Sequence, residues 1–302
     1  MKVSGFTFVR HAVALDFPVV ESIKSILPIV DEFIVNIGPD DDGTLSLISS
    51  IKDSKIKIIQ SQWNPNLVSG GYVYAQQTNI ALFNCTGDWA IYLQADEVIH
   101  EDDLPLIQDF MQKYLKDERV EGLALNELTF WGDYKTLLKV YPWAYSKRCW
   151  VVKPHKFVLS RGDAAGFTVH PKYKERGRKI RVLDTGGRVF HYSFVRSEEM
   201  LKKKAKLVLI YWQDRYSQHD IDRINVSLYK CLPRQFMTGY SGSHPKVMET
   251  RIKNHSVSVD LDSKEWREQL TWNEYKLLIK TKLVKIFGES RLGWGAYKLL
   301  SF

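Results

Sequence analysis

The chain has 302 residues, of which 44% are hydrophobic and 26% charged, and its formal net charge is +8. This composition is typical of a folded globular protein and excludes an intrinsically disordered chain. The sequence contains no apolar run of roughly eighteen residues, and its N-terminus lacks an apolar segment with a small-residue cleavage site, so we expect neither a membrane-spanning helix nor a signal peptide.

Strand-type and helix-type segments alternate through the first part of the chain. Short apolar runs of strand type occupy residues 3–9, 33–37, 55–60 and 88–93. Apolar residues at helical spacing occupy residues 19–29, 45–51, 75–83 and 103–115. An Asp-rich turn at residues 38–44 follows the second strand. The alternation predicts an α/β fold with a mostly parallel sheet, right-handed crossovers and flanking helices.

The pattern changes after residue 120. Residues 121–160 are rich in aromatic residues and predict antiparallel strands, and residues 178–192 predict two further strands. Residues 197–212 predict a helix with Ser197 at its N-cap. Residues 272–287 have apolar residues at near-helical spacing, with lysines between them. Such a helix lies on an anionic bilayer surface, caps the rest of the fold or pairs with another subunit.

Charge is distributed unevenly along the chain. Residues 1–100 have a net charge of −5, residues 101–200 of +4 and residues 201–302 of +9. The basic C-terminal third favours an anionic partner such as a membrane surface or a phosphorylated acceptor. No nucleic-acid-binding motif is visible, and we expect no nucleic-acid partner. We place a boundary near residue 195, where the helical and basic part begins.

The segment WAIYLQADEV, residues 89–98, is a strand that ends in adjacent carboxylates. Ligands of an open α/β sheet bind beyond the carboxyl ends of its strands, and Asp96 and Glu97 lie just past such an end. A carboxylate there can hold a divalent cation, which in turn can hold a diphosphate. The cation stabilises the negative charge that builds up on the diphosphate when a sugar leaves it. The alternative is a pair of ordinary loop acids.

The longer stretch YAQQTNIALFNCTGDWAIYLQADEVIHEDDLPLI, residues 74–107, resembles the family-two glycosyltransferases of the GT-A fold. In that family, an Asp-rich turn follows the second strand, and a Gly-Asp-aromatic turn leads into a strand that ends in the DXD metal motif. The resemblance covers roughly residues 3–195. It implies a Rossmann-like GT-A catalytic domain over residues 1–195, with a nucleotide-binding half at 1–107 and an acceptor-binding half at 108–195. A helical, basic extension, 196–302, follows.

The resemblance also implies a donor site. Asp96 matches the last aspartate of the motif and would bind Mn²⁺ or Mg²⁺ with His191 and Glu97, although a histidine satisfied by packing is the alternative for His191. Gln94 replaces the first aspartate of the motif, and its amide would contact the ribose or a phosphate oxygen. The nucleoside would be contacted by side chains of the Asp-rich turn and of the 75–83 helix, namely Asp40, Asp42, Thr78 and Asn79.

Inverting sugar transfer also needs a base that deprotonates the acceptor hydroxyl. The acceptor-binding half offers Asp163 in SRGDAAGF, Asp133 in FWGDYK and Glu127 in LNELTF. We rank Asp163 first because it lies in a glycine-bearing loop of this half. A group of aromatic residues is either a stacking platform for an acceptor sugar or ordinary core material: Phe130, Trp131, Tyr134, Tyr141, Trp143, Tyr145 and Trp150.

We therefore expect an inverting, metal-assisted glycosyltransferase that uses a nucleoside-diphosphate sugar as donor. Its acceptor would be a glycan or a lipid-linked glycan of bacterial-type surface polysaccharide synthesis. Two alternatives stay open. A nucleotidyltransferase is disfavoured because the segment after the first strand, FVRHAVALD, has no glycine, and a non-enzymatic binder of anionic polymers rests on basic charge alone. The isolated cysteines favour a reducing, cytoplasmic location, with the inner face of the membrane as a further site.

Overall fold

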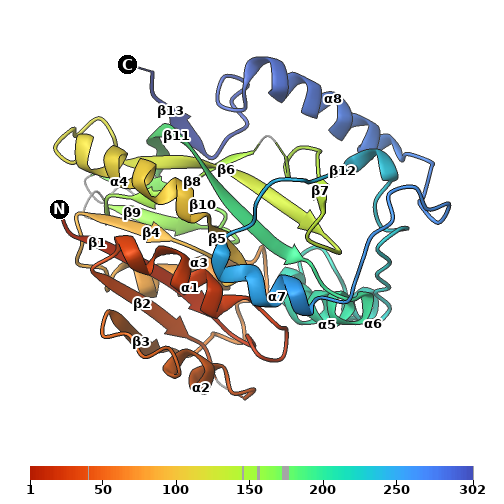
Figure 1. Ribbon diagram of the computed structural model, residues 1–302, viewed down its shortest axis with the longest axis horizontal. Coiled ribbons are helices and arrows are strands. Elements are labelled where there is room, and N and C mark those ends of the chain that lie inside the picture. The colour runs from red at the N-terminus through yellow and green to blue at the C-terminus, as the bar shows by residue number, and fades with distance from the viewer. Residues whose placement is uncertain (40, 145, 155–156, 172–176, 302) are drawn as a thin grey trace.

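The computed structural model describes residues 1–39, 41–144, 146–154, 157–171 and 177–301. They form a mixed α/β fold in which helices flank one long, curled sheet (Figure 1). Its main path runs β3-β2-β1-β4-β8-β6-β11-β10-β9. The α/β class predicted from the sequence is confirmed.

The strands are β1 (Val3–Val9), β2 (Glu32–Ile37), β3 (Ile56–Gln60), β4 (Trp89–Tyr92), β5 (Glu97–Ile99), β6 (Gly122–Trp131), β7 (Thr136–Leu138), β8 (Lys147–Val152), β9 (Val158–Arg161), β10 (Gly166–Val169), β11 (Arg178–Phe194), β12 (Met237–Gly239) and β13 (Tyr297–Leu299). The helices are α1 (Val19–Ile26), α2 (Thr44–Ser49), α3 (Tyr72–Leu82), α4 (Leu104–Lys113), α5 (Glu198–Leu209), α6 (Gln218–Asp222), α7 (Glu249–Asn254) and α8 (Trp272–Phe287). Short 3-10 turns extend α1 (Leu27–Ile29) and α5 (Ile210–Trp212) and precede α4 (Glu101–Asp103).

The N-terminal half is a parallel sheet, as the alternating pattern predicts. β1 pairs in parallel with β2 and β4, and β2 pairs in parallel with β3. Glu32 joins the N-terminal ends of these strands. Its carboxylate accepts hydrogen bonds of 2.7 Å from Ser4 Oγ, Thr86 N and Lys57 Nζ. Burial raises the pKa of Glu32, but these donors outweigh burial and lower that pKa to about 2.

The second half of the sheet contains both parallel and antiparallel strand pairs. β6 pairs antiparallel with β8, as predicted for residues 121–160, and parallel with β11. The prediction of two strands over residues 178–192 was wrong, because one long strand, β11, covers this stretch. Its pairing with β6 shifts register between Asp184 and Arg188, and Gly186 takes a φ of 79° there. A bulge formed at Gly186 therefore interrupts the pairing within one continuous strand, where the sequence analysis expected two separate strands.

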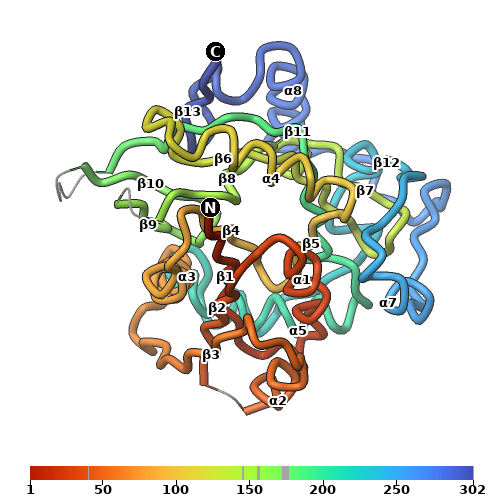
Figure 2. Tube along the Cα trace, turned by 60° about the vertical axis from the view of Figure 1, so that its left-hand side comes forward, coloured from red at the N-terminus to blue at the C-terminus, as the bar shows by residue number. Residues whose placement is uncertain are grey.

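The C-terminal third returns to the sheet. Ser197 caps α5 by accepting a hydrogen bond from Met200 N, as predicted, and α8 covers the predicted residues 272–287. β12 pairs with β7, and β13 pairs in parallel with β11. Both views show α5 and α8 well apart on the molecule (Figures 1 and 2). The domain boundary near residue 195 stays a prediction.

The apolar core lies on both faces of the sheet. One cluster joins α1 and α4 to the sheet through residues such as Ile23, Ile107 and Trp89. A second cluster lies under α3, around Phe6 and Tyr92. Of the helices described in the structure, none combines the length and apolarity needed to cross a bilayer.

Candidate functional site

A cavity of about 310 Å³ lies beyond the carboxyl ends of β1 and β4. Because the two strands are parallel neighbours, the segments that follow them enter the cavity side by side: Arg10 and His11 after β1, and Gln94, Ala95 and Asp96 after β4. The end of β11 supplies another wall. Helix α5 closes the cavity through Lys204, Leu207 and Val208, which share one helix face.

Asp96 is the central carboxylate of this cavity and is almost fully buried. Its Oδ2 accepts a 2.9 Å hydrogen bond from Lys204 Nζ, and its Oδ1 lies 3.6 Å from His191 Nε2. Lys204 Nζ also donates to Ser193 Oγ at 2.6 Å and to the Ser193 carbonyl at 3.2 Å. The structure thus brings together Asp96 and His191, two of the residues proposed from the sequence, and adds Lys204 and Ser193, which the sequence analysis did not name.

Asp96 and its two cationic neighbours, His191 and Lys204, stabilise one another's charged forms. Burial raises the pKa of the Asp96 carboxyl, but Lys204 and His191 outweigh burial and hold that pKa well below its usual range. Burial lowers the pKa of His191, but Asp96 and Glu127 outweigh burial and raise it to about 9. Burial lowers the pKa of Lys204 to about 8, against the attraction of Asp96. The site therefore holds ionised groups of alternating sign.

Glu127, one of the three candidate bases, lies behind His191 and does not line the cavity. Its Oε1 is 2.9 Å from His191 Nδ1 and accepts a 3.2 Å hydrogen bond from Thr129. Its Oε2 is 2.9 Å from Arg148 Nε. Burial raises the pKa of Glu127, but Arg148 and His191 outweigh burial and lower it. Glu127 thus orients His191 and is shielded from an acceptor.

Glu97 points away from the cavity. Its Oε2 accepts hydrogen bonds from Gln94 N at 2.8 Å and from Trp150 Nε1 at 2.9 Å, and its side chain is buried. Burial raises its pKa. The expected metal set of Asp96, Glu97 and His191 is therefore not assembled: one carboxylate is turned inward, and the other is held by an ammonium group.

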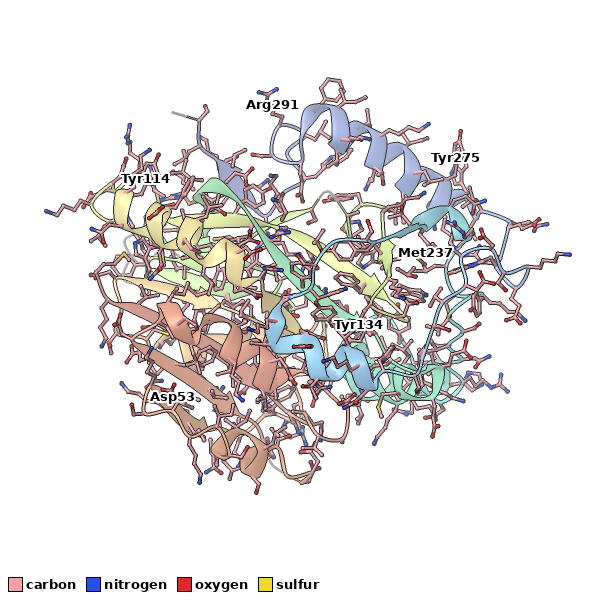
Figure 3. All side chains as sticks on the ribbon, in the orientation of Figure 1. Asp53, Tyr114, Tyr134, Met237, Tyr275 and Arg291 are labelled. Carbon is pink, nitrogen blue, oxygen red and sulfur yellow. The ribbon has the colours of Figure 1, made fainter. Side chains whose placement is uncertain are left out.

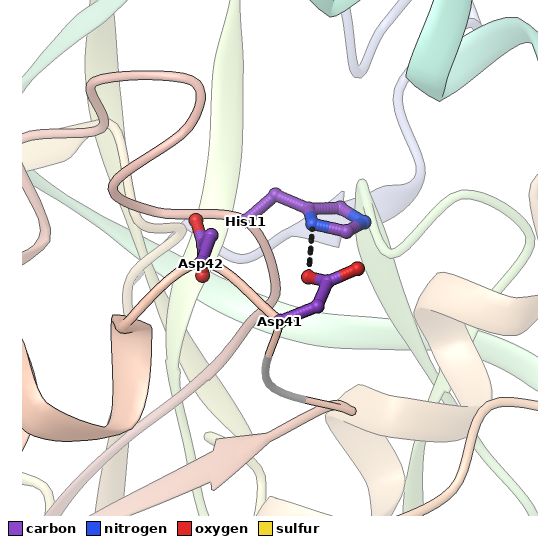
Figure 4. Close-up of side chains that lie close together, drawn as sticks. All are labelled: His11, Asp41 and Asp42. Atoms are coloured by element: carbon purple, nitrogen blue, oxygen red, sulfur yellow. Dashed lines mark ion pairs between the residues drawn. The ribbon is translucent and has the colours of Figure 1, made fainter.

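A different group of side chains lies close enough to share an ion: His11, Asp41 and Asp42 (Figure 4). His11 Nδ1 is 3.1 Å from Asp41 Oδ1. Asp42 accepts hydrogen bonds from Ala14 N at 2.8 Å and from Thr44 Oγ1 at 2.6 Å, so its carboxylate holds the loop after β1 against the start of α2. Of the three, His11 lines the cavity. Asp40, which we expected to contact the nucleoside, lies outside the described residues.

The two α3 residues that were expected to contact the nucleoside make hydrogen bonds within the protein instead. Thr78 is fully buried and donates to the Tyr74 carbonyl at 2.7 Å. The Asn79 amide bonds to both Ser160 N, at 2.8 Å, and Ser160 O, at 3.1 Å, and so ties α3 to β9. Neither residue lines the cavity, whereas Gln94 does.

Asp163 and Asp133 differ in access. Asp163 is exposed, lines the cavity and accepts one 3.3 Å hydrogen bond from Ala165 N. Asp133 is buried outside the cavity, where its two oxygens accept from Lys135 N at 2.9 Å and from Val259 N at 2.8 Å. Of the three candidate bases, Asp163 is the one that an incoming hydroxyl can reach.

An aromatic wall lines the cavity, and the sequence interpretation missed it. The Trp63 ring lies 5.9 Å from Tyr74 and 5.4 Å from Tyr211. The Arg10 guanidinium lies 5.5 Å from the Trp63 ring and donates to Tyr211 Oη at 3.1 Å. Within the described ranges, Arg10 Nε and Trp63 Nε1 are buried donors without a hydrogen-bond partner. Buried donors of this kind call for a ligand or water that accepts from them.

The aromatic group that the sequence singled out lies elsewhere. Phe130, Trp131, Tyr134 and Trp150 are buried in the core, and none of the described members of the group lines the cavity. Tyr145 lies outside the described residues. The aromatic residues that line the cavity come instead from the segment after β3, from α3 and from the turn after α5.

No family model matches the sequence, and no curated protein matches it. Among solved structures, the chain is similar to residues 1–349 of S. aureus TarS in complex with UDP, with 14% identity over 73% of this chain and 68% of that chain and a TM-score of 0.38. It is also similar to the mannosyltransferase PcManGT from Pyrobaculum calidifontis in complex with GDP-Man and Mn²⁺, with 19% identity over 41% of this chain and 34% of that chain and a TM-score of 0.32. A third is glucosyl-3-phosphoglycerate synthase from Mycobacterium tuberculosis with Mn²⁺, UDP and glucosyl-3-phosphoglycerate, at 16% identity over 42% of this chain and 44% of that chain, with a TM-score of 0.30. These values are low, and the functional proposal rests on the site itself.

Proposed function

We propose that this protein transfers a sugar from a nucleoside-diphosphate donor to a hydroxyl group of a glycan acceptor. One observation carries the proposal: a single cavity combines an aromatic wall, cationic side chains and a solvent-accessible carboxylate. Aromatic rings such as Trp63 stack on a nucleobase, and buried donors such as Trp63 Nε1 meet its carbonyl oxygens or the ribose. The other parts of the cavity suit the diphosphate and the acceptor.

The charge of the cavity favours an anionic ligand. Of the described residues that line it, Arg10, Arg148, Lys204 and the protonated His191 are cationic, against the two acids Asp96 and Asp163. A cavity with an excess of positive charge attracts a diphosphate and stabilises the charge that develops on it. The divalent cation that the sequence resemblance implies does not fit the Asp96 carboxylate as it is bonded here, and no step of the reaction is assigned to it.

The chemistry needs one base and one leaving group. The acceptor oxygen attacks the anomeric carbon of the donor sugar, and the bond from that carbon to the diphosphate oxygen breaks. The bonding electron pair leaves with the diphosphate, and the hydroxyl proton passes to the Asp163 carboxylate. Attack on the side opposite the leaving group inverts the anomeric carbon. Asp163 supports this role because it is exposed at the cavity.

Calorimetry with UDP, GDP, CDP and dTDP tests the proposal. We expect at least one of these diphosphates to bind, and Arg10→Met to weaken that binding at least tenfold, since a charge-assisted hydrogen bond contributes roughly 1.5–3 kcal/mol. Arg119→Met is the matched control, because Arg119 is exposed, pairs with Asp117 and does not line the cavity. Absence of binding for all four diphosphates, with and without Mn²⁺, contradicts the proposal.

We further propose that α8 places the enzyme on an anionic membrane surface, where a lipid-linked glycan would serve as acceptor. One side of α8 packs on the protein: Val284 is buried, and Thr281 Oγ1 accepts from Tyr141 N at 2.8 Å. Its outer side exposes large apolar residues, and Figure 3 shows Tyr275 at the outside of the molecule. These residues are Trp272, Tyr275, Ile279, Ile286 and Phe287.

The arrangement of lysines supports a bilayer as the partner of this helix. At about 100° per residue, the exposed apolar side chains fall on one stripe of α8. Lys280 and Lys282 border this stripe, and Lys276 lies within it, with its ammonium 5.4 Å from the Trp272 ring. Apolar side chains between flanking lysines match the boundary between acyl chains and anionic headgroups. Each lysine near such a surface contributes about 1 kcal/mol to binding.

Co-sedimentation with vesicles tests the membrane proposal. The intact protein is expected to bind vesicles that contain phosphatidylserine or phosphatidylglycerol and not neutral phosphatidylcholine vesicles. The double variant Lys276→Glu/Lys280→Glu is expected to bind at least tenfold more weakly. Lys202→Glu/Lys203→Glu on α5 changes the net charge equally at another exposed surface and is expected to keep binding. Equal loss in both double variants would contradict a role specific to α8.

A further inference from the structure

Lys204 is mostly buried and is held in place by hydrogen bonds, unlike a surface lysine that points into solvent. It belongs to α5, whose Leu201 is buried and whose Leu207 and Val208 line the cavity beside it. The side chain of Lys204 is 14% exposed, and its ammonium lies 4.8 Å from the Phe17 ring. The Ser193 hydroxyl, the Ser193 carbonyl and Asp96 each accept from its Nζ. Three acceptors match the three donors of an ammonium group and fix its place.

A divalent cation on Asp96 would have to share this place. Such an ion binds carboxylate oxygens at about 2.0–2.6 Å. Asp96 Oδ2 is already 2.9 Å from the Lys204 ammonium, and Oδ1 faces the His191 ring. The neighbouring positions offer no second carboxylate, because residue 94 is a glutamine and Glu97 bonds to Trp150. The metal would stand next to a fixed cation with a single acid as its ligand.

We propose that the Lys204 ammonium replaces the divalent cation, so that this protein binds and stabilises the leaving diphosphate without a metal ion. This inference rests on the proposed function of the same cavity. Asp96 then acts as a positioning residue that holds the ammonium at the cavity wall. The ammonium supplies a fixed positive charge where negative charge develops on the diphosphate as the bond to the sugar breaks.

Ser193 completes the arrangement. Its Oγ accepts from Lys204 Nζ, so its own hydroxyl hydrogen is directed elsewhere, and Ser193 lines the cavity. A hydroxyl that accepts from an ammonium is polarised and donates a stronger hydrogen bond. Lys204 and Ser193 together thus offer a cation and a donor to the same phosphate oxygens, and neither has to lose a proton during the reaction.

Calorimetry of UDP, GDP, CDP and dTDP in EDTA and in Mn²⁺ tests the inference on the full-length protein. We expect the diphosphate that binds to do so in EDTA, with an affinity within threefold of that measured in Mn²⁺. Binding that appears only with Mn²⁺ overturns the inference and leaves the proposed function standing. Failure of all four diphosphates under both conditions overturns the proposed function, and the inference with it.

Two substitutions on one helix sharpen the test. Lys204→Met keeps the length of the side chain and removes its charge, and we expect binding in EDTA to fall at least tenfold. It also frees Asp96 Oδ2, so Mn²⁺ is expected to restore part of the affinity. Lys203→Met, at an exposed position of the same helix, is the matched control and is expected to bind as the unmodified protein does. Unchanged binding by Lys204→Met in EDTA overturns the inference, and if this variant fails to fold, the comparison of EDTA with Mn²⁺ on the unmodified protein still decides.

Discussion

Asp163→Asn is expected to lower the turnover of sugar transfer by about 10²–10⁴-fold, the usual contribution of a general base. The substitution keeps the shape of the side chain and removes its ability to accept a proton at neutral pH. Asp163 is exposed and makes one hydrogen bond, to Ala165 N, so the fold should tolerate the change. Release of the diphosphate from the matching nucleotide sugar, followed with and without a glycan acceptor, measures the effect.

Asp133→Asn separates a catalytic effect from a structural one. Asp133 accepts hydrogen bonds from Lys135 N and Val259 N and lies outside the cavity. We expect this variant to lose stability in urea and to keep its turnover per folded molecule. Asp163→Asn should show the opposite behaviour, with an unchanged affinity for the diphosphate by calorimetry. Turnover of Asp163→Asn within threefold of the unmodified protein would exclude Asp163 as the base.

The parts of the fold that depend on local pattern could be predicted from the sequence. The parallel strands, α1, α3, α5 and α8 follow from apolar periodicity and from caps such as Ser197. The break expected within residues 178–192 is absent, because the two glycines there form a bulge inside a paired strand. A glycine pair has the same local signature in a turn and in a bulge, and the partner strand decides between them.

Of the residues that line the cavity, the sequence analysis named some at its centre and few of those in its walls. The position of Asp96 past the end of β4 follows from the rule for ligand sites in α/β sheets, and His191 lies at the end of a strand paired in parallel with β6. Lys204 is one of several lysines in the same helix, and from the sequence alone it is indistinguishable from lysines on a solvent-exposed face. One signal could have found it: Leu201, Lys204 and Tyr211 follow a spacing of three and seven, the stripe that faces the protein. No local pattern brings Trp63 and Arg10 together, because they meet through the tertiary packing of segments far apart in the chain.

Glu127→Ala is expected to destabilise the protein by about 3–5 kcal/mol, the cost of leaving a buried charge without its partner. The Glu127 side chain is fully buried and lies between two cationic groups, at 2.9 Å from His191 Nδ1 and from Arg148 Nε. Its removal leaves both without a counter-ion on that side and opens a cavity behind the site. The free energy of unfolding in urea measures the loss, and Glu265→Ala, at an exposed position, should stay within about 0.5 kcal/mol of the unmodified protein.

Glu127→Gln distinguishes charge from shape. Its amide oxygen can still accept from His191 Nδ1, so the cavity does not open and the ring keeps its orientation, but Arg148 loses its counter-ion. We therefore expect a smaller loss of stability than in Glu127→Ala. Glu127, His191, Asp96 and Lys204 form a row of alternating charges. A change at Glu127 therefore reaches the ammonium at the cavity wall through two intermediate residues, His191 and Asp96. Diphosphate binding in EDTA is therefore expected to weaken in Glu127→Gln. Unchanged stability of Glu127→Ala would show that this row of charges does not hold the site together.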